Sequence, residues 1–175
     1  VAAIGTVGSV AEAMRDGIAG NARLLLGGDV ELRSLYMPTP DPVLATAQEY
    51  GTLSRTMTMR AMLQVGEERR LVALKAVDDA WPMVGAAELG SGGALAPAVA
   101  DGKVIIDPQL ARDLGLVAGS TVRIGNAELE VSDTLEYEPD RSVSFVTFGP
   151  RVLVSLTTLA ATGLSQPGAM VTFRT

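Results

Sequence analysis

Apolar and polar positions follow a regular pattern between residues 103 and 131. Val104–Ile106 is a short apolar, β-branched run, which predicts a strand. Asp107 follows it and can accept backbone N–H groups as a helix N-cap, and the proline after it has a φ suited to a first helical position. The pattern therefore predicts a short helix over 108–114 that ends at Gly115.

The second half of this stretch predicts two further strands joined by a tight turn. Residues 122–124 begin the first of them, and Gly125 and Asn126 can form a two-residue hairpin turn because both residues tolerate positive φ. Leu129 and Val131 then alternate with two glutamates, which is the period of a half-buried strand. The succession of strand, short helix, strand, hairpin and strand indicates a small barrel or meander.

Another hairpin is predicted earlier in the chain. Apolar residues occupy every second position over 57–63, so that one face of the predicted strand is apolar. Residues 66–68 form the turn, and 70–77 is the partner strand.

The remaining pattern gives elements on both sides of these hairpins. Ser9 and Glu12 fit a capping box at the start of a helix, and Asp41 is the expected N-cap of another. The strand over 151–155 follows Pro150 and is expected at a sheet edge. The full set is helices over 9–26, 41–50 and 156–161, strands over 29–35, 134–137, 143–148, 151–155 and 168–174, and a Gly- and Ala-rich connector over 85–102. This order is typical of an α+β fold.

Composition removes several classes of function. The 175 residues carry a formal charge of −6, so a nucleic-acid partner is not expected. The chain contains neither histidine nor cysteine, which excludes disulfides, thiol chemistry, histidine-based triads and the common zinc sites. No apolar run reaches the roughly 20 residues of a membrane span. The apolar residues 1–7 leave two interpretations open, the end of a transmembrane helix or the start of an ordinary buried element.

Carboxylates and glycines offer weak candidates for chemistry. The run Gly5–Ser9 has G-x-x-G rather than the G-x-G-x-x-G of dinucleotide sites. Asp78 and Asp79 lie near Lys75, but adjacent strand residues point to opposite faces, so we interpret the pair as a turn or cap.

Three further carboxylates and three serines are weak candidates for a site. Glu136, Glu138 and Asp140 do not match a calcium loop, and a solvated hairpin end explains them better. Serines 9, 91 and 155 lack the G-x-S-x-G elbow, although a pairing of one of them with Lys75 or Lys103 stays open.

Several segments together resemble one family, the extracytoplasmic domains of MacB/FtsX-like ABC transporter permeases, and within it the YbbP-type subgroup. Residues 74–78 with 81–85 resemble its K-A-V-D-x-x-Y-P-L-x-G segment, and 104–131 its helix and small β-domain. Residues 24–32, 148–155 and 162–164 are similar to its other segments. Two positions depart from the pattern, Trp81 in place of tyrosine and Ser120 in place of aspartate.

The resemblance implies a domain outside the cytoplasmic membrane, made of two lobes. A porter-like α/β lobe, only partly contained here, would comprise residues 1–76 with 165–175, and an inserted β-rich, barrel-like lobe residues 77–164. It implies no catalytic, cofactor-binding or metal-binding residues, and ATP hydrolysis in a separate cytoplasmic subunit that partners the permease through its membrane helices. Hydrophobic or lipid-type cargo, or an extracytoplasmic partner protein, would be handled outside.

Two alternatives compete with this interpretation. One is a soluble hydrolase that acts on lipids or esters with a serine and an acid. The other is a free-standing binding module.

Overall fold

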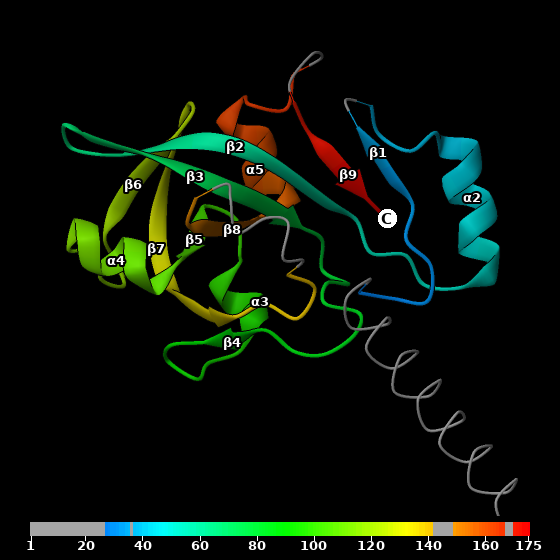
Figure 1. Cartoon of the computed structure of the whole chain (residues 1–175), viewed down its shortest axis with the longest axis horizontal. Helices are drawn as coiled ribbons and strands as arrows, with labels where there is room; N and C mark the ends of the chain where they lie inside the picture. The colour runs from blue at the N-terminus through cyan, green and yellow to red at the C-terminus, as the bar shows by residue number, and fades with distance from the viewer. Residues whose placement is uncertain (1–26, 36, 142–148, 167–169) are drawn as a thin grey trace, which may run out of the picture.

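The computed structural model describes residues 27–35, 37–141, 149–166 and 170–175. Its strands are β1 (Arg33–Leu35), β2 (Thr56–Val65), β3 (Glu68–Val77), β4 (Glu88–Leu89), β5 (Lys103–Ile106), β6 (Thr121–Ile124), β7 (Ala127–Tyr137), β8 (Arg151–Ser155) and β9 (Thr172–Arg174). Its helices are α2 (Asp41–Tyr50), α3 (Leu95–Ala98), α4 (Pro108–Leu114) and α5 (Leu156–Thr162), as Figure 1 shows. The α+β class predicted from the sequence is confirmed.

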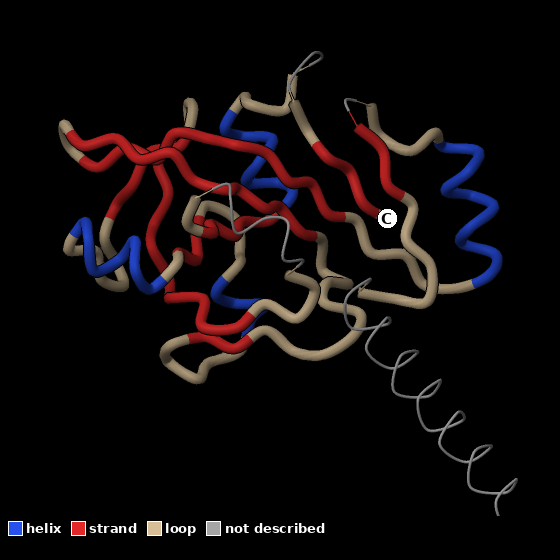
Figure 2. The backbone as a smooth tube through the Cα atoms, in the orientation of Figure 1, coloured by secondary structure: helices blue, strands red, loops and turns tan. Residues whose placement is uncertain are grey.

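Six strands close into a barrel. Around the ring β2 pairs with β3, β3 with β8, β8 with β5, β5 with β7, β7 with β6, and β6 again with β2. The β3–β8 and β5–β7 pairs are parallel and the others are antiparallel. The long β2–β3 hairpin runs along one side of the molecule in Figure 2. The predicted barrel-like architecture is confirmed, but the ring includes β2 and β3, which lie before the predicted start of the β-rich lobe at residue 77.

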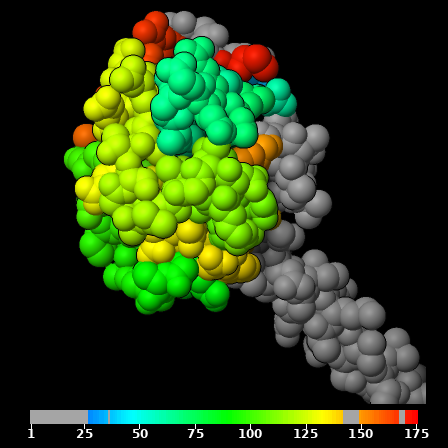
Figure 3. All heavy atoms as spheres, turned by 90° about the vertical axis from the view of Figure 1, so that its left-hand side faces the viewer, coloured from blue at the N-terminus to red at the C-terminus, as the bar shows by residue number. Residues whose placement is uncertain are grey.

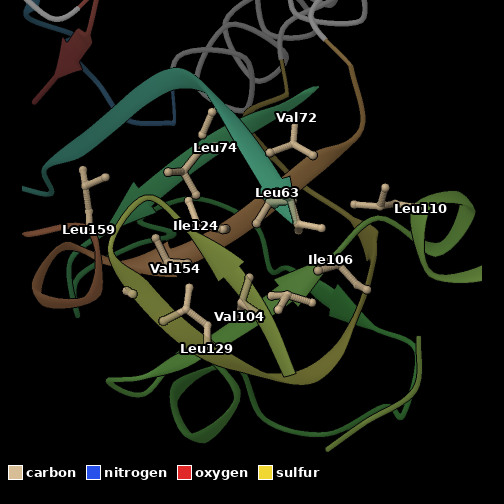
Figure 4. Packing of buried hydrophobic residues seen from close by; sticks show 14 of the residues in the cluster. Leu63, Val72, Leu74, Val104, Ile106, Leu110, Ile124, Leu129, Val154 and Leu159 are labelled. Atoms are coloured by element: carbon tan, nitrogen blue, oxygen red, sulfur yellow. The ribbon is translucent and has the colours of Figure 1, made fainter. Parts of the chain in front are cut away.

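Aliphatic side chains fill the barrel. Leu63, Leu74, Ile106 and Ile124 are completely buried and come from four different strands (Figure 4). Leu159 of α5 joins the same cluster. Figure 3 looks at the side where the blue-green β2–β3 hairpin and the yellow-green α4 lie one above the other. Each such side chain contributes about 1.5–3 kcal/mol when fully buried, so the barrel has a core of its own.

Two local predictions within the barrel are confirmed. The Asp107 carboxylate accepts the backbone N–H groups of Gln109 and Leu110 at 2.8 and 3.4 Å, which caps α4, and Gly115 ends the helix with φ of 62°. The turn at Gly125 joins β6 to β7. A Cβ on Gly125 would lie 2.3 Å from the carbonyl oxygen of Thr162, so the approach of the end of α5 requires glycine there.

A second part of the molecule, which we call the outer region, comprises residues 27–55 and 170–175. In it β9 pairs with the start of β2, and β1 pairs with β9. Helix α2 lies beyond β1 in Figure 1 and has no buried residue. Pro40 rather than Asp41 occupies its N-cap, and no side chain bonds there, so the predicted capping role of Asp41 is wrong by one position.

Other sequence predictions need correction. Strand β8 is not an edge strand, because it lies between β3 and β5. Pro150 precedes the strand, so its missing N–H costs no ladder bond, while its carbonyl accepts the N–H of Ala73 at 2.9 Å. Strand β7 continues through 134–137 as one element, and the connector over 85–102 contains β4 and α3. The predicted helix over 9–26 and the predicted strand over 143–148 lie wholly outside the described residues.

The division into lobes at residue 76 remains a prediction. A boundary at residue 76 would assign the β2–β3 hairpin to the first lobe. However, β2 pairs with β9 of the outer region near its start and with β6 of the barrel near its end. The hairpin is therefore shared between the outer region and the barrel.

Candidate functional site

Four charged side chains are buried together where the barrel meets the outer region. Lys75 Nζ donates to Glu138 Oε1 at 2.8 Å and to the two carboxylate oxygens of Asp140 at 2.6 and 2.7 Å. Arg151 Nε donates to Glu138 Oε2 at 2.8 Å. All four side chains are at most 7 % exposed. The two positive and two negative charges balance, as buried ions require if they are to remain charged.

A tryptophan completes this group, which we call the charge cluster. Trp81 Nε1 donates to Asp140 Oδ2 at 3.1 Å, and Lys75 Nζ lies 4.4 Å from the centre of the indole ring. An ammonium over an aromatic face gains electrostatic energy, particularly when water is excluded. Trp81 therefore holds both the cation and the carboxylate of one ion pair.

Sheet pairing explains how these side chains meet. Lys75 lies in β3 and Arg151 in β8, and the two strands are parallel neighbours in which Lys75 is in register with Leu153. Glu138 and Asp140 lie in the turn that leaves β7. The first half of β3 is exposed and its second half is entirely buried. Lys75 falls in the buried half, so its charge needs carboxylate partners from another element.

Asp140 remains a carboxylate in spite of its burial. Burial raises the pKa of Asp140, but the charge and hydrogen bond of Lys75, the hydrogen bond of Trp81 and the charge of Arg174 together lower it below its ordinary value. The lowered pKa thus keeps Asp140 ionised at neutral pH.

Asp140 also forms part of the wall of a hollow of 830 Å³ between α2, the segment before β1 and Trp81. Most of the wall is apolar, with contributions from Val43, Tyr50 and Leu53. Arg174 lies in the same wall and binds Glu31 through Nε at 2.6 Å and Nη2 at 2.8 Å. The hydrogen bond and charge of Glu31 raise the pKa of Arg174 despite partial burial.

The solvated-end interpretation of 136–140 is wrong for two of its three carboxylates. Glu136 is exposed, whereas Glu138 and Asp140 are buried. Residues 138–141 have the composition of a solvent-facing turn, so the sequence pattern does not predict the burial of Glu138 and Asp140. A signal was nevertheless present, because Lys75 interrupts an apolar run that is too hydrophobic to face water and must be paired.

The remaining candidate residues have structural roles. Asp78 accepts the Ser54 hydroxyl at 2.9 Å and the Arg55 backbone N–H at 2.6 Å, which agrees with a turn or cap role, and Asp79 is exposed. Lys75 is thus paired with Glu138 and Asp140 instead of with Asp78. The Gly5–Ser9 run lies outside the described residues.

Neither described serine candidate pairs with a lysine. The Ser91 hydroxyl donates to the Asp133 carboxylate in the turn that follows β4. Ser155 caps α5 by accepting the N–H of Thr158 at 3.0 Å, and its hydroxyl donates to Asp101 at 2.8 Å. Within the described ranges no group of three carboxylates could hold a metal ion, and no helix is long and apolar enough to cross a membrane. Lys75 and Trp81 bond to the carboxylates of the cluster, so it can fix the geometry where the barrel meets the outer region.

The whole chain matches the model of one protein family. Residues 1–175 match the MacB-like periplasmic core domain. This chain belongs to that family. The chain is therefore an extracytoplasmic domain of an ABC transporter permease, as the resemblance predicted. Domains of this family are generally non-catalytic.

Individual relatives of the MacB-like periplasmic core domain agree with this assignment. Over 175 residues the chain is 32 % identical to the uncharacterized ABC transporter permease YbbP of Escherichia coli (strain K12), covering 99 % of this chain and 21 % of that protein. The chain thus spans about a fifth of the length of this curated relative.

Two solved structures share the fold. The periplasmic region of MacB from Actinobacillus actinomycetemcomitans gives a TM-score of 0.53 at 13 % identity, over 79 % of this chain and 64 % of that one. The extracellular domain of the noncanonic ABC-type transporter YknZ from Gram-positive bacteria also gives 0.53, at 15 % identity over 83 % of both chains.

Proposed function

We propose that this domain is a non-catalytic, extracytoplasmic part of an ABC transporter permease, which couples ATP-driven motion of transmembrane helices to the export or extraction of hydrophobic or lipid-type cargo. The partner in this proposal is a cytoplasmic ATP-binding subunit, reached through the membrane helices. The match of all 175 residues to the MacB-like periplasmic core domain is the observation that carries it.

The construction of the barrel supports a mechanical role. A closed ring gives every strand two neighbours, and its aliphatic core is packed from strands on all sides. Close-packed interiors have low compressibility and transmit displacement. A rigid body of this kind is suited to carrying motion from the membrane helices to a cargo outside.

The pairing within the charge cluster supports a non-catalytic role for the domain. Its acids and bases are paired with one another, and the serines at 91 and 155 serve turns and caps. The hydrolase alternative needs a nucleophile activated by a base. The hydroxyls of Ser91 and Ser155 donate to the carboxylates of Asp133 and Asp101, but neither serine bonds to a lysine or to a residue of the charge cluster. A free-standing binding module is less favoured, because the family match is to a permease domain.

Reconstitution would test the coupling. The permease that carries this domain would be placed in lipid vesicles with its ATP-binding subunit, and both ATP hydrolysis and removal of a fluorescent phospholipid would be followed. We expect Lys75→Met to leave most ATP hydrolysis in place while lipid removal falls to background. Arg123→Met, which breaks an exposed ion pair with Glu128, is the matched control and should transport normally.

A separate assay addresses the hydrolase alternative. The purified chain would be incubated with ester and phospholipid substrates. Turnover that disappears in Ser91→Ala or Ser155→Ala would contradict the non-catalytic proposal.

A further inference from the structure

Six charged residues form a sequence of alternating sign from the outer region into the barrel. In order they are Glu31, Arg174, Asp140, Lys75, Glu138 and Arg151, and we call this set the charge row. Four of its five links are hydrogen-bonded ion pairs of 2.6–2.8 Å. The net charge of the row is zero.

The fifth link, between Arg174 and Asp140, crosses from the outer region to the barrel. Both side chains lie in the wall of the same hollow. Thr56, which is buried, also lies in this wall and is in register with Arg174 on one side and with Val77 of β3 on the other. The two charges also act on each other, in addition to the effects of burial and of their nearer partners. The charge of Arg174 lowers the pKa of Asp140, and the charge of Asp140 raises the pKa of Arg174.

The backbone of the outer region approaches Asp140 as well. Gly27 has φ of 73°, and a Cβ built on it would lie 3.3 Å from the Cβ of Asp140. The backbone at residue 27 therefore lies beside the side chain of Asp140, with little room for a larger residue.

We propose that the charge row is a coupling element, through which a displacement of the segment before β1 or of β9 changes the geometry around Asp140 and Trp81. Its purpose rests on the proposed mechanical function, but its existence does not. If the charge of Glu31 is removed, Arg174 loses its close partner and its attraction shifts to Asp140. Asp140 then turns from Lys75 and Trp81, and the indole loses its hydrogen-bond acceptor.

Trp81 makes this testable, because it is the single tryptophan among the 175 residues. Its fluorescence and its quenching by acrylamide report on the surroundings of the indole, which include the charge cluster and the hollow. The test variants are Glu31→Gln and Arg174→Met. Glu128→Gln, in the exposed pair with Arg123, is the control, and Asp140→Asn shows the signal of direct disruption.

We expect quenching of Trp81 to increase about twofold in Glu31→Gln, which corresponds to the lower end of coupling within one ion-pair network. Quenching should stay at the parent level in Arg174→Met, because this variant lacks the cation that would attract Asp140. The control should match the parent chain. Glu31 is half-buried and at the end of the row, so Glu31→Gln keeps the test valid even if Asp140→Asn does not fold. Unchanged quenching in folded Glu31→Gln would overturn the coupling. An equal increase in Arg174→Met would also overturn it, because the effect would then not depend on the charge of Arg174.

Failure of this inference is distinguishable from failure of the proposed function. The fluorescence is measured on the chain without membrane or ATP. A permease that still removes lipid when Trp81 is uncoupled from Glu31 would retain its transport role, and only the charge row would be rejected as the path of coupling.

Discussion

The barrel and the outer region belong to one continuous sheet, but they exclude water to different degrees. In the barrel, β5 and β8 are almost wholly buried and their side chains belong to packed clusters. In the outer region, α2 buries no residue, and β1 is exposed or partly exposed along its length. A helix of ten residues is marginal in water without tertiary packing, so the two regions differ in stability as well as in burial.

This difference indicates a division of tasks. The barrel holds its shape through aliphatic packing on all sides. The outer region is attached through backbone pairing of β9 with β2 and through Val171 and Phe173, which pack against the barrel core. Local stability in proteins follows such differences in buried contact, and mobile or moving elements come from the less stable part. The charge cluster lies between the two regions, where a stiff body and an adaptable one meet.

The largest effect should follow from a charge in the barrel core. Ile124 is 0 % exposed and its neighbours in register are Leu63 and Ala127. Ile124→Asp buries a carboxylate without a partner, at a cost of several kcal/mol, which is comparable to the whole stability of many domains. We expect loss of the cooperative urea transition followed by circular dichroism. Val117→Asp at an exposed position should melt like the parent, and retained cooperativity in Ile124→Asp would show that the barrel core is not the stabilising unit.

The charge cluster should give the next largest effect. Lys75→Met leaves the carboxylates of Glu138 and Asp140 buried without the ammonium, and breaking a buried pair in this way costs about 3–5 kcal/mol. Arg123→Met removes the cation of an exposed pair and should cost less than about 1 kcal/mol. Urea titrations of both variants give the comparison. Equal losses would mean that water reaches the cluster in solution.

Acid should weaken the same cluster through Asp140. Its folded pKa is below the unfolded value of about 3.9, so its contribution is complete above that value and is lost as the pH falls through the folded pKa. We expect the difference in unfolding free energy between the parent and Asp140→Asn to be constant from pH 7 to 5 and to shrink below about pH 4. Urea titrations across this range measure it. A difference that grows on acidification has the wrong sign for an ionised Asp140.

Local and long-range features of the molecule differ in how well the sequence predicts them. Within the barrel, local signals decided the outcome: the Asp107 cap, the Gly125–Asn126 turn and the alternation in β7 act over a few residues and were recovered correctly. The position of β8 was wrong because strand order depends on long-range pairing with β3 and β5, which no local pattern encodes. The burial of Asp140 was missed for the same reason, since its partner Lys75 is 65 residues away.

The smallest effect is expected in the outer region, and it tests whether the contrast between the regions holds in solution. Tyr50 at the end of α2 is 86 % exposed, so Tyr50→Ser should change the unfolding free energy by no more than about 0.5 kcal/mol. Leu159→Ala removes a buried barrel side chain instead and should cost about 2–5 kcal/mol. Urea titrations of the two variants under the same conditions measure this ratio. A loss above about 1 kcal/mol for Tyr50→Ser would mean that α2 packs against something in solution, and the outer region would then stabilise the fold instead of being carried by the barrel.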